Sequence, residues 1–232
     1  MIVQPLPWDE EFFGFTVGSL VVPPASSPDD VSDIVKSCDC DVVYVQVKNP
    51  KPDQLECFSS LAPLADHKIV YKKTISTDFV FPKEQLLPYE GGVTDALLEM
   101  AWASGMHSRY YLDCRFQPHY RRFYRTWLVN SIEGDFADVV FVPQIGDTQV
   151  GFVSLVTKGS VGRISLITVS QNYRKQGIGG QLLQSVDAWC WESGLNQVRV
   201  ATQERNTDAC RLYERHGYQV DETIGIYHCW KS

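Results

Sequence analysis

The amino-acid sequence predicts a two-part α/β protein. Strand-like and helical segments are both found along its 232 residues, and 44% of these residues are hydrophobic, enough to bury a core. Charge divides the chain: residues 1–88 have seven lysines, no arginine and thirteen acids, whereas residues 89–232 have eleven arginines, three lysines and fifteen acids. We therefore expect a small N-terminal α/β domain over residues 1–88 and a second domain over residues 89–232.

The N-terminal part is predicted to contain short strands around one helix. Residues 41–47 and 69–81 are rich in β-branched and aromatic side chains, which favour strands. Pro28 and the acidic residues after it are typical of a helix start, so residues 29–36 are predicted to be helical. Pro88 and the glycines that follow it mark the boundary between the two parts.

The second part is predicted to begin with two helices. Residues 94–103 form the first, and Pro118 precedes the second. Along this second helix one face is apolar and aromatic, with Tyr120, Phe123, Tyr124, Trp127, Leu128 and Ser131. The opposite face is basic, with Arg121, Arg122 and Arg125. We expect this helix to be half buried.

Four strands are predicted after these helices. Residues 138–142 and 149–156 flank a turn at Gly146 and are expected to form a hairpin. Residues 163–169 form the third strand and residues 198–202 the fourth. A helix with Leu182, Leu183, Val186, Trp189 and Cys190 on one face lies between the last two.

Composition excludes several classes of function. The chain has 21 basic and 28 acidic side chains, a formal charge of −7, which argues against a general nucleic-acid binder. No apolar run reaches the roughly 18 residues of a membrane span, and the acidic start does not resemble a secretion signal, so we expect a cytoplasmic protein. The seven cysteines include no CxxC pair, and we expect reduced thiols and no metal site, Cys38 and Cys40 included.

The segment from Ser170 to Gly180 joins a strand to a helix through a glycine-rich loop. Glycines let the backbone approach a ligand, and the free amides of a helix start suit a diphosphate. The loop fits neither the GxGxxG motif, because Leu182 occupies the third glycine position, nor a P-loop. We therefore expect a phosphate-bearing cofactor other than a dinucleotide.

This loop, Arg174-Lys175-Gln176-Gly177-Ile178-Gly179, resembles the acetyl-CoA loop of the GCN5-related N-acetyltransferase (GNAT) family, which reads Arg/Gln-x-x-Gly-x-Gly/Ala. The later run from Asn206 to Tyr218, with its Asn-x6-Tyr-x3-Gly-Tyr pattern, is also similar to that family. The resemblance covers about residues 92–232. It implies a mixed, mainly antiparallel sheet flanked by helices, and acetyl-CoA as cosubstrate.

Within the GNAT family, residues 8–14, 123–127 and 199–207 look like the TDP-fucosamine acetyltransferases. This resemblance implies transfer of acetyl to the amine of a nucleotide-linked amino sugar, a small-molecule substrate used for bacterial surface polysaccharide. Two alternatives remain open. The acidic N-terminal part favours a cationic acceptor such as a protein N-terminus or a small amine, and the lack of a carboxylate on the strand before the loop favours a non-catalytic acyl-CoA sensor. A homodimer is the commonest assembly for soluble enzymes.

The resemblance also implies the site residues. The pantetheine arm would pair with residues 167–169, the loop amides would hold the diphosphate, and Tyr213 would protonate the departing thiolate. A phenol near pKa 10 can donate to a thiolate whose thiol titrates near 8.5. From the residues alone, Asn206 caps a helix and Tyr213 follows two turns later on the same face. The expected acetyl-CoA site comprises Ile167, Thr168, Val169, Arg174, Lys175, Gln176, Gly177, Ile178, Gly179, Gly180, Asn206 and Tyr213.

Several residues remain candidates for the general base and for the acceptor site. Residues 164–168 contain no carboxylate, so His228, Glu204 or a water chain are candidates for the base, although each side chain is more often structural or solvated. The arginines and aromatics of residues 109–125 suit a nucleotide diphosphate and its base, or else a solvated helix face. Trp8, Phe12 and Phe13 either line the same cleft or pack in the core.

Overall fold

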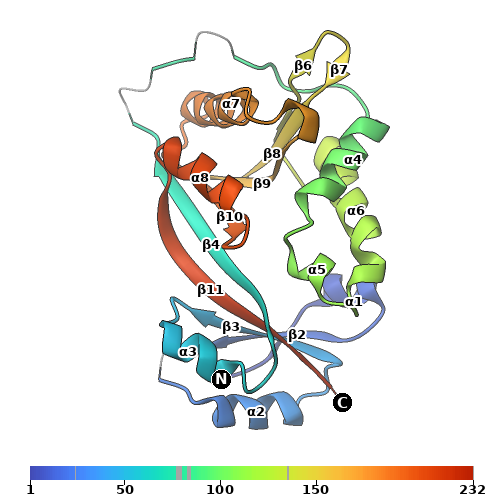
Figure 1. The fold of residues 1–232 in the computed structure, drawn as a ribbon, viewed down its shortest axis with the longest axis vertical. Coiled ribbons are helices and arrows are strands. Elements are labelled where there is room, and N and C mark those ends of the chain that lie inside the picture. Colours follow the sequence, from blue (N-terminus) through green and yellow to red (C-terminus); the bar gives the residue numbers. More distant parts are fainter. Residues whose placement is uncertain (24, 77–79, 83–84, 135, 232) are drawn as a thin grey trace.

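One long, twisted sheet organises the molecule (Figure 1). The computed structural model describes residues 1–23, 25–76, 80–82, 85–134 and 136–231. Nine strands among them lie in the order β1-β2-β3-β11-β4-β10-β9-β8-β5, and only the β2–β3 and β9–β10 pairs are parallel. The predicted mixed, mainly antiparallel sheet is therefore confirmed. The strands are β1 (Gln4–Pro5), β2 (Val17–Val22), β3 (Val42–Lys48), β4 (Leu64–Thr74), β5 (Val139–Phe141), β8 (Gly151–Lys158), β9 (Val161–Val169), β10 (Gln197–Gln203) and β11 (Gln219–Trp230).

Helices flank this sheet, as predicted. The described residues form eight α-helices: α1 (Pro7–Phe13), α2 (Pro28–Ser37), α3 (Pro52–Phe58), α4 (Asp95–Ser104), α5 (Arg109–Leu112), α6 (Tyr120–Ile132), α7 (Ile178–Glu192) and α8 (Thr207–Arg215). Local chemistry explains several starts. Ser27 caps α2 by accepting a hydrogen bond from the Asp30 amide at 3.2 Å, and Thr94 caps α4 in the same way. The predicted buried and basic faces of α6 are confirmed.

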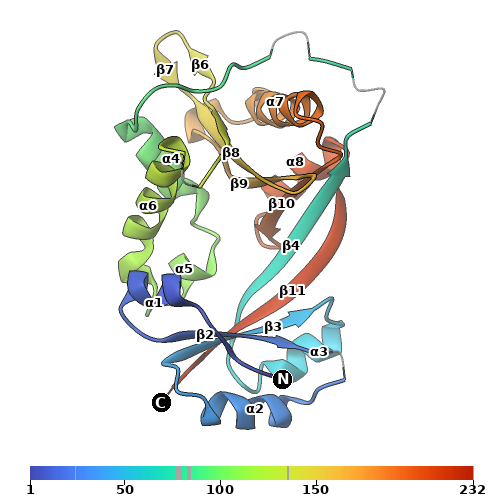
Figure 2. The ribbon, with the colours of Figure 1, turned by 180° about the vertical axis from the view of Figure 1, so that it is seen from behind.

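The two long strands β4 and β11 lie side by side through the middle of the molecule (Figure 1, Figure 2). β11 pairs with β3 on its other side, and β4 pairs with β10, so strands from residues 1–88 and from residues 89–232 alternate in one sheet. The sheet thus crosses the expected boundary, and a division of the chain into two domains there stays a prediction.

Strand limits differ from the expected ones in two places. β4 begins at Leu64, earlier than the predicted start at residue 69, because its pairing with β11 extends over residues whose polar pattern does not indicate a strand. It ends at Thr74, and residues 77–79 of the predicted strand lie outside the described residues. The expected hairpin forms between β5 and β8, and its tip at Gly146 has its own short ladder of β6 (Gln144–Ile145) and β7 (Thr148–Gln149).

Apolar side chains gather in three clusters that cover different parts of the sheet. α7 packs Leu182, Leu183, Val186 and Cys190 against one face of β8, β9 and β10. α2 and α3 cover β2, β3 and β11 at the other end. An aromatic cluster joins α1, α4, α5 and α6 and packs against the sheet through β3, β8 and β9. Between this aromatic layer and the middle of the sheet lies the cavity described below.

Among the described residues, no helix is long and apolar enough to cross a bilayer. The same part of the chain contains no group of three or more His, Cys, Asp or Glu side chains placed to hold a metal ion. All seven cysteines are free thiols.

Candidate active site

β9 and β10 separate halfway along their length and open a wedge in the sheet. Their parallel pairing ends at Ile164 and Val200, whereas β9 continues to Val169 beside β8 and β10 continues to Gln203 beside β4. Ser165 is the extra residue of a bulge between β8 and β9 at this point. Past the bulge each strand has an edge that pairs with no other strand of the described residues, and such an edge can pair with an extended ligand.

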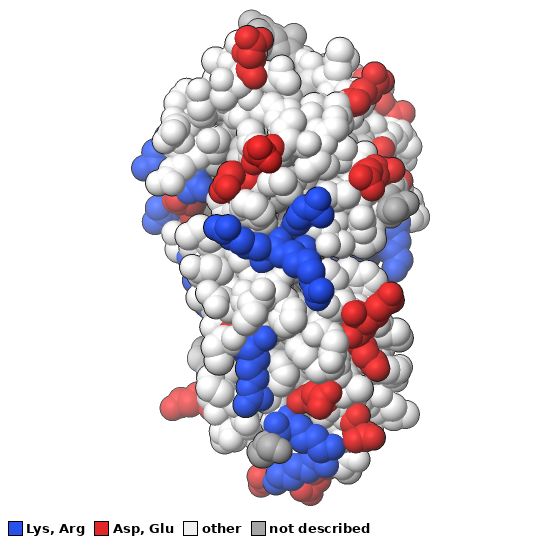
Figure 3. Space-filling view, turned by 90° about the vertical axis from the view of Figure 1, so that its right-hand side faces the viewer, with Lys and Arg blue, Asp and Glu red and all other residues white. Residues whose placement is uncertain are grey.

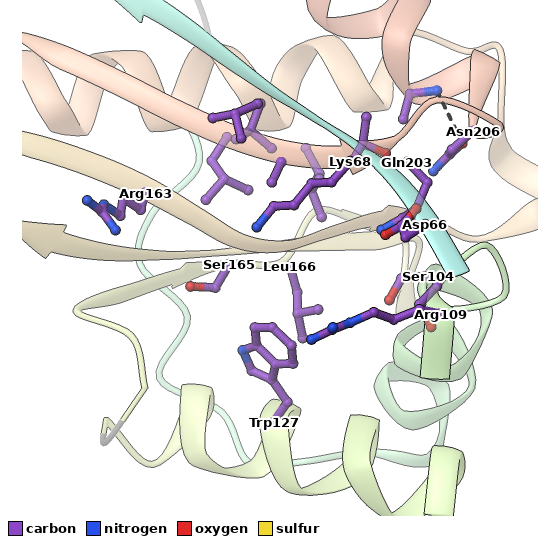
Figure 4. A pocket seen from close by; sticks show the side chains of 18 of the residues that line it. Asp66, Lys68, Ser104, Arg109, Trp127, Arg163, Ser165, Leu166, Gln203 and Asn206 are labelled. Carbon is purple, nitrogen blue, oxygen red and sulfur yellow. Dashed lines mark hydrogen bonds between the residues drawn. The ribbon is translucent and has the colours of Figure 1, made fainter. Parts of the chain in front are cut away.

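A cavity of about 870 Å³ adjoins the wedge, between the sheet and the helices α1, α5 and α6 (Figure 4). Alternate residues of β4 and β11 face the cavity, and β10 contributes the consecutive residues from Arg199 to Gln203. The opposite wall includes Trp8, Arg109, Tyr110 and Trp127. Of the residues predicted for the cofactor site, Ile167, Asn206 and Tyr213 line this cavity.

The glycine-rich loop follows the end of β9 and leads into α7. Lys175 and Gly177 have positive φ angles of 61° and 87°, and Gly177 is the residue directly before the helix. Arg174 ties the loop to the strand, because its Nε donates to the Val169 carbonyl at 3.2 Å. The first amides of α7, which have no partner within the helix, and its positive dipole end are thus placed at the end of the wedge. This arrangement fits the diphosphate of acetyl-CoA.

The left-handed backbone at Gly177 makes a test of this loop possible. Gly177→Ala is expected to cost about 1–2 kcal/mol, because a Cβ is disfavoured at this φ, and to weaken acetyl-CoA binding several-fold by shifting the loop amides. Isothermal titration with acetyl-CoA and urea unfolding measure the two effects. Gly159→Ala is the matched control, since Gly159 also has positive φ but lies in the turn between β8 and β9, at the other end of β9 from the loop. Equal acetyl-CoA affinity in both variants would contradict the assignment.

Tyr213 on α8 lines the cavity with only 2% of its surface exposed. Its ring packs against Tyr71 and Tyr218, with centroids 5.5 and 6.0 Å away. Burial raises the pKa of the Tyr213 phenol above its ordinary value, so the phenol keeps its proton at neutral pH. Asn206 caps α8 as predicted, with Oδ1 accepting from the Ala209 amide at 3.4 Å.

β4 contributes the Asp66 carboxylate, which was not predicted from the sequence as a site residue. Asp66 lines the cavity, is 3% exposed, and its Oδ1 has no hydrogen-bond partner among the described residues. An Arg205 Nη2 lies 4.0 Å away. Burial raises the pKa of Asp66 to about 6, although Arg205 and Arg109 act in the opposite direction. The only signal in the sequence was the alternation of Asp66, Lys68 and Val70, which places all three on one strand face.

The two side chains predicted as alternative bases have other partners. His228 Nδ1 lies 2.6 Å from an Asp113 oxygen, and its Nε2 lies 3.4 Å from Arg109 Nη1, so this nitrogen can act as an acceptor behind Arg109. Burial lowers the pKa of His228. Glu204 bonds His67 at 2.9 Å with its side chain 63% exposed. Neither His228 nor Glu204 lines the cavity.

The arginines of residues 109–125 do not line one common site. Arg109 lines the cavity and stacks on Tyr44 and Tyr110, 4.1 and 4.7 Å from the ring centres. Arg121 and Arg122 instead lie on the outer face of α6, over the Trp102 and Phe12 rings. Basic side chains gather in the middle of the side of the molecule that faces the viewer in Figure 3, the side on which α6 lies.

The N-terminal aromatics divide between the cavity and the core. Trp8 lines the cavity and is 43% exposed. Phe13 is buried in the aromatic cluster, and Phe12 packs against its edge. The cavity wall therefore includes one of these three side chains, and packing explains the other two.

Comparison with known sequences identifies the family. A sequence model of the "Acetyltransferase (GNAT) family" matches residues 96–218, more than half of the chain. The chain belongs to the GNAT family. It is therefore an acyltransferase that uses acetyl-CoA as its acetyl donor, as the resemblance of its loop implied. The geometry of this GNAT acetyltransferase fits acetyl-CoA. The strand edges of the wedge suit its extended arm, and the first amides of α7 suit its diphosphate.

Two curated relatives extend the comparison. A dTDP-fucosamine acetyltransferase of Escherichia coli O6:H1 (strain CFT073) is 25% identical over 233 residues, covering 95% of each chain. The spore coat polysaccharide biosynthesis protein SpsD of Bacillus subtilis (strain 168) is 28% identical over 176 residues, covering 74% of this chain and 57% of that protein. The chain thus spans little more than half the length of SpsD.

The fold agrees with a solved structure at low sequence identity. A GCN5-related N-acetyltransferase from Kribbella flavida has a TM-score of 0.55 at 12% identity, and the match covers 94% of this chain and 82% of that one. This likeness supports the GNAT fold.

Proposed function

We propose that this GNAT acetyltransferase transfers acetyl from acetyl-CoA to the amino group of a nucleotide-linked amino sugar. One observation carries the proposal: the cavity beside the wedge combines a buried carboxylate, Asp66, with cationic and aromatic walls. Such a cavity suits a ligand that presents an amine at one end and phosphates elsewhere. The near full-length similarity to a dTDP-fucosamine acetyltransferase supports the same acceptor class.

The residues around the wedge have distinct roles in this reaction. Asp66 accepts a proton from the sugar ammonium, which leaves a neutral amine. The amine attacks the thioester carbonyl, and a backbone N–H of residues 167–169 stabilises the oxyanion. After the attack the nitrogen carries one proton too many, and it releases this proton to solvent. The C–S bond then breaks, and Tyr213 donates its proton to the sulfur. Solvent then returns a proton to Tyr213 and takes one from Asp66.

The wider setting of the enzyme is part of the proposal. A nucleotide amino sugar as substrate is consistent with a role in polysaccharide biosynthesis, the process named for SpsD. The cytoplasmic location and the homodimer remain predictions from the sequence.

A panel of acceptors tests the proposed function. Thiol release from acetyl-CoA is measured with TDP- and UDP-linked amino sugars, the matching free amino sugars, an N-terminal peptide and a polyamine. We expect turnover with a nucleotide-linked amino sugar and at least tenfold lower kcat/KM with its free counterpart. Turnover only with the peptide or the polyamine would contradict the nucleotide-sugar acceptor and indicate a protein N-terminus or a small amine instead. Tight acetyl-CoA binding without turnover on any amine would indicate a non-catalytic acyl-CoA sensor.

A further inference from the structure

Several charged side chains face the cavity, and most of them already have a partner. Arg199 is paired with Asp221, which also bonds Lys72 at 2.6 Å. Glu222 is paired with Lys48 at 3.2 Å. Asp9 accepts a hydrogen bond from Tyr44 at 3.3 Å, and Asp66 faces Arg205.

Besides Arg109, which stacks on two tyrosines, two cations of the cavity wall have no paired acid among the described residues. Within the part of the chain that the structure describes, no carboxylate oxygen lies within 4.0 Å of a Lys68 or Arg163 side-chain nitrogen. Figure 4 shows the Lys68 side chain reaching away from Asp66, toward the end of the cavity where Arg163 lies. This end of the cavity therefore offers two cationic groups that have no direct ion pair.

Lys68 is also placed close to other positive charges. Its side chain is half buried, and burial, followed by the repulsion of Arg109, lowers its pKa, although Asp66 and Glu222 act in the opposite direction. Repulsion between Lys68 and Arg109 in a partly buried cavity is costly unless an anion binds nearby. A diphosphate, which accepts from a lysine amine and from an arginine fork, would relieve that repulsion.

The phosphates of acetyl-CoA do not account for these cations. Their expected site is the loop before α7, which follows Val169 at the end of β9. Arg163 precedes Val169 by six residues on that strand, about 20 Å away. Arg163 is thus remote from the diphosphate of the donor, and because the Lys68 side chain reaches toward it, we assign this end of the cavity to the acceptor.

We propose that Lys68 and Arg163 bind the diphosphate of the nucleotide-linked acceptor. The proposal rests on the proposed function and adds the phosphate site to it. Asp66 and Lys68 are two residues apart on one strand face, about 7 Å along β4. If Lys68 binds the diphosphate, the amine on the opposite side of the sugar would lie near Asp66. Arg109 would then lie next to the sugar ring.

Binding of TDP and UDP to the whole enzyme tests this site without turnover. Isothermal titration is carried out on the wild type, on Lys68→Met, on Arg163→Met and on the double variant. Each single substitution is expected to weaken nucleoside diphosphate binding about 10- to 100-fold, the range for hydrogen bonds to charged groups. The affinity for acetyl-CoA is expected to stay unchanged. Lys72→Met is the matched control, because Lys72 lies on the same face of β4 but is paired with Asp221 and does not line the cavity.

Kinetics on the same variants separates the two proposals. Lys68→Met is expected to raise KM for the nucleotide-linked amino sugar and to leave kcat/KM for the free amino sugar unchanged. Unaltered TDP and UDP affinity in the double variant would overturn the phosphate site, and an equal loss of acetyl-CoA affinity would assign the cations to the donor. Failure of every nucleotide-linked amino sugar in the acceptor panel would instead overturn the proposed function.

Discussion

Tyr213→Phe is expected to lower kcat about 10²- to 10⁴-fold, the range for loss of a positioned general acid. The thiolate leaving group then has no proton donor in the wedge, whereas the packing of the ring against Tyr71 and Tyr218 is retained. Acetyl-CoA affinity is expected to stay within about twofold, because the diphosphate contacts lie in the loop before α7. Thiol-release kinetics and isothermal titration measure the two quantities.

Tyr218→Phe is the matched control for this prediction. Tyr218 is a buried tyrosine beside Tyr213, but its hydroxyl donates to Asp187 at 3.1 Å and it does not line the cavity. We expect this variant to lose about 1–2 kcal/mol of stability and to keep its kcat. If Tyr213→Phe kept wild-type turnover, or if both variants lost turnover equally, the hydroxyl of Tyr213 would not be the acid.

Asp66→Asn is expected to lower kcat/KM for the amino-sugar acceptor about 10²- to 10⁴-fold, because the ammonium then loses its proton acceptor. The wild-type rate is expected to rise with pH through about 6, since the carboxylate must be ionised to act as a base and burial raises its pKa to about 6. The rate of the Asp66→Asn variant is expected not to rise with pH in this range. A pH–rate profile of both proteins checks the assignment.

Stability measurements distinguish this role from a structural one. The folded-state pKa of Asp66, about 6, exceeds the unfolded value near 3.9, so the folded state binds the proton more tightly. Ionising Asp66 therefore costs stability, about 2–3 kcal/mol, which accrues as pH rises from about 4 to above 6. We expect Asp66→Asn to be at least as stable as the wild type at pH 7 in urea unfolding. A large loss of stability there would indicate a structural carboxylate.

Local sequence signals were sufficient for many individual elements. Several signals depend on contacts within a few residues, so their positions could be predicted: the apolar spacing of α6 and α7, the Pro28 helix start and the Asn206 cap. The positive φ at Gly177 likewise follows from the loop itself. The family could be recognised for the same reason, because its motif is short and continuous.

The acceptor side of the cavity could not be predicted from such signals. Asp66 and Lys68 reach it because β4 pairs with β10 and β11, which lie more than 120 residues later in the chain. Arg121 and Arg122 looked equally suited to a phosphate, but the helix face that carries them points outward.

Neighbouring residues were enough to predict the acetyl-CoA loop, the helix that follows it and the family of this protein. The fold was needed to find which carboxylate and which cations face the cavity beside Tyr213. These side chains come together through the pairing of distant strands. Register between them places alternate side chains on one face of the sheet, and no local pattern encodes which strand will lie alongside.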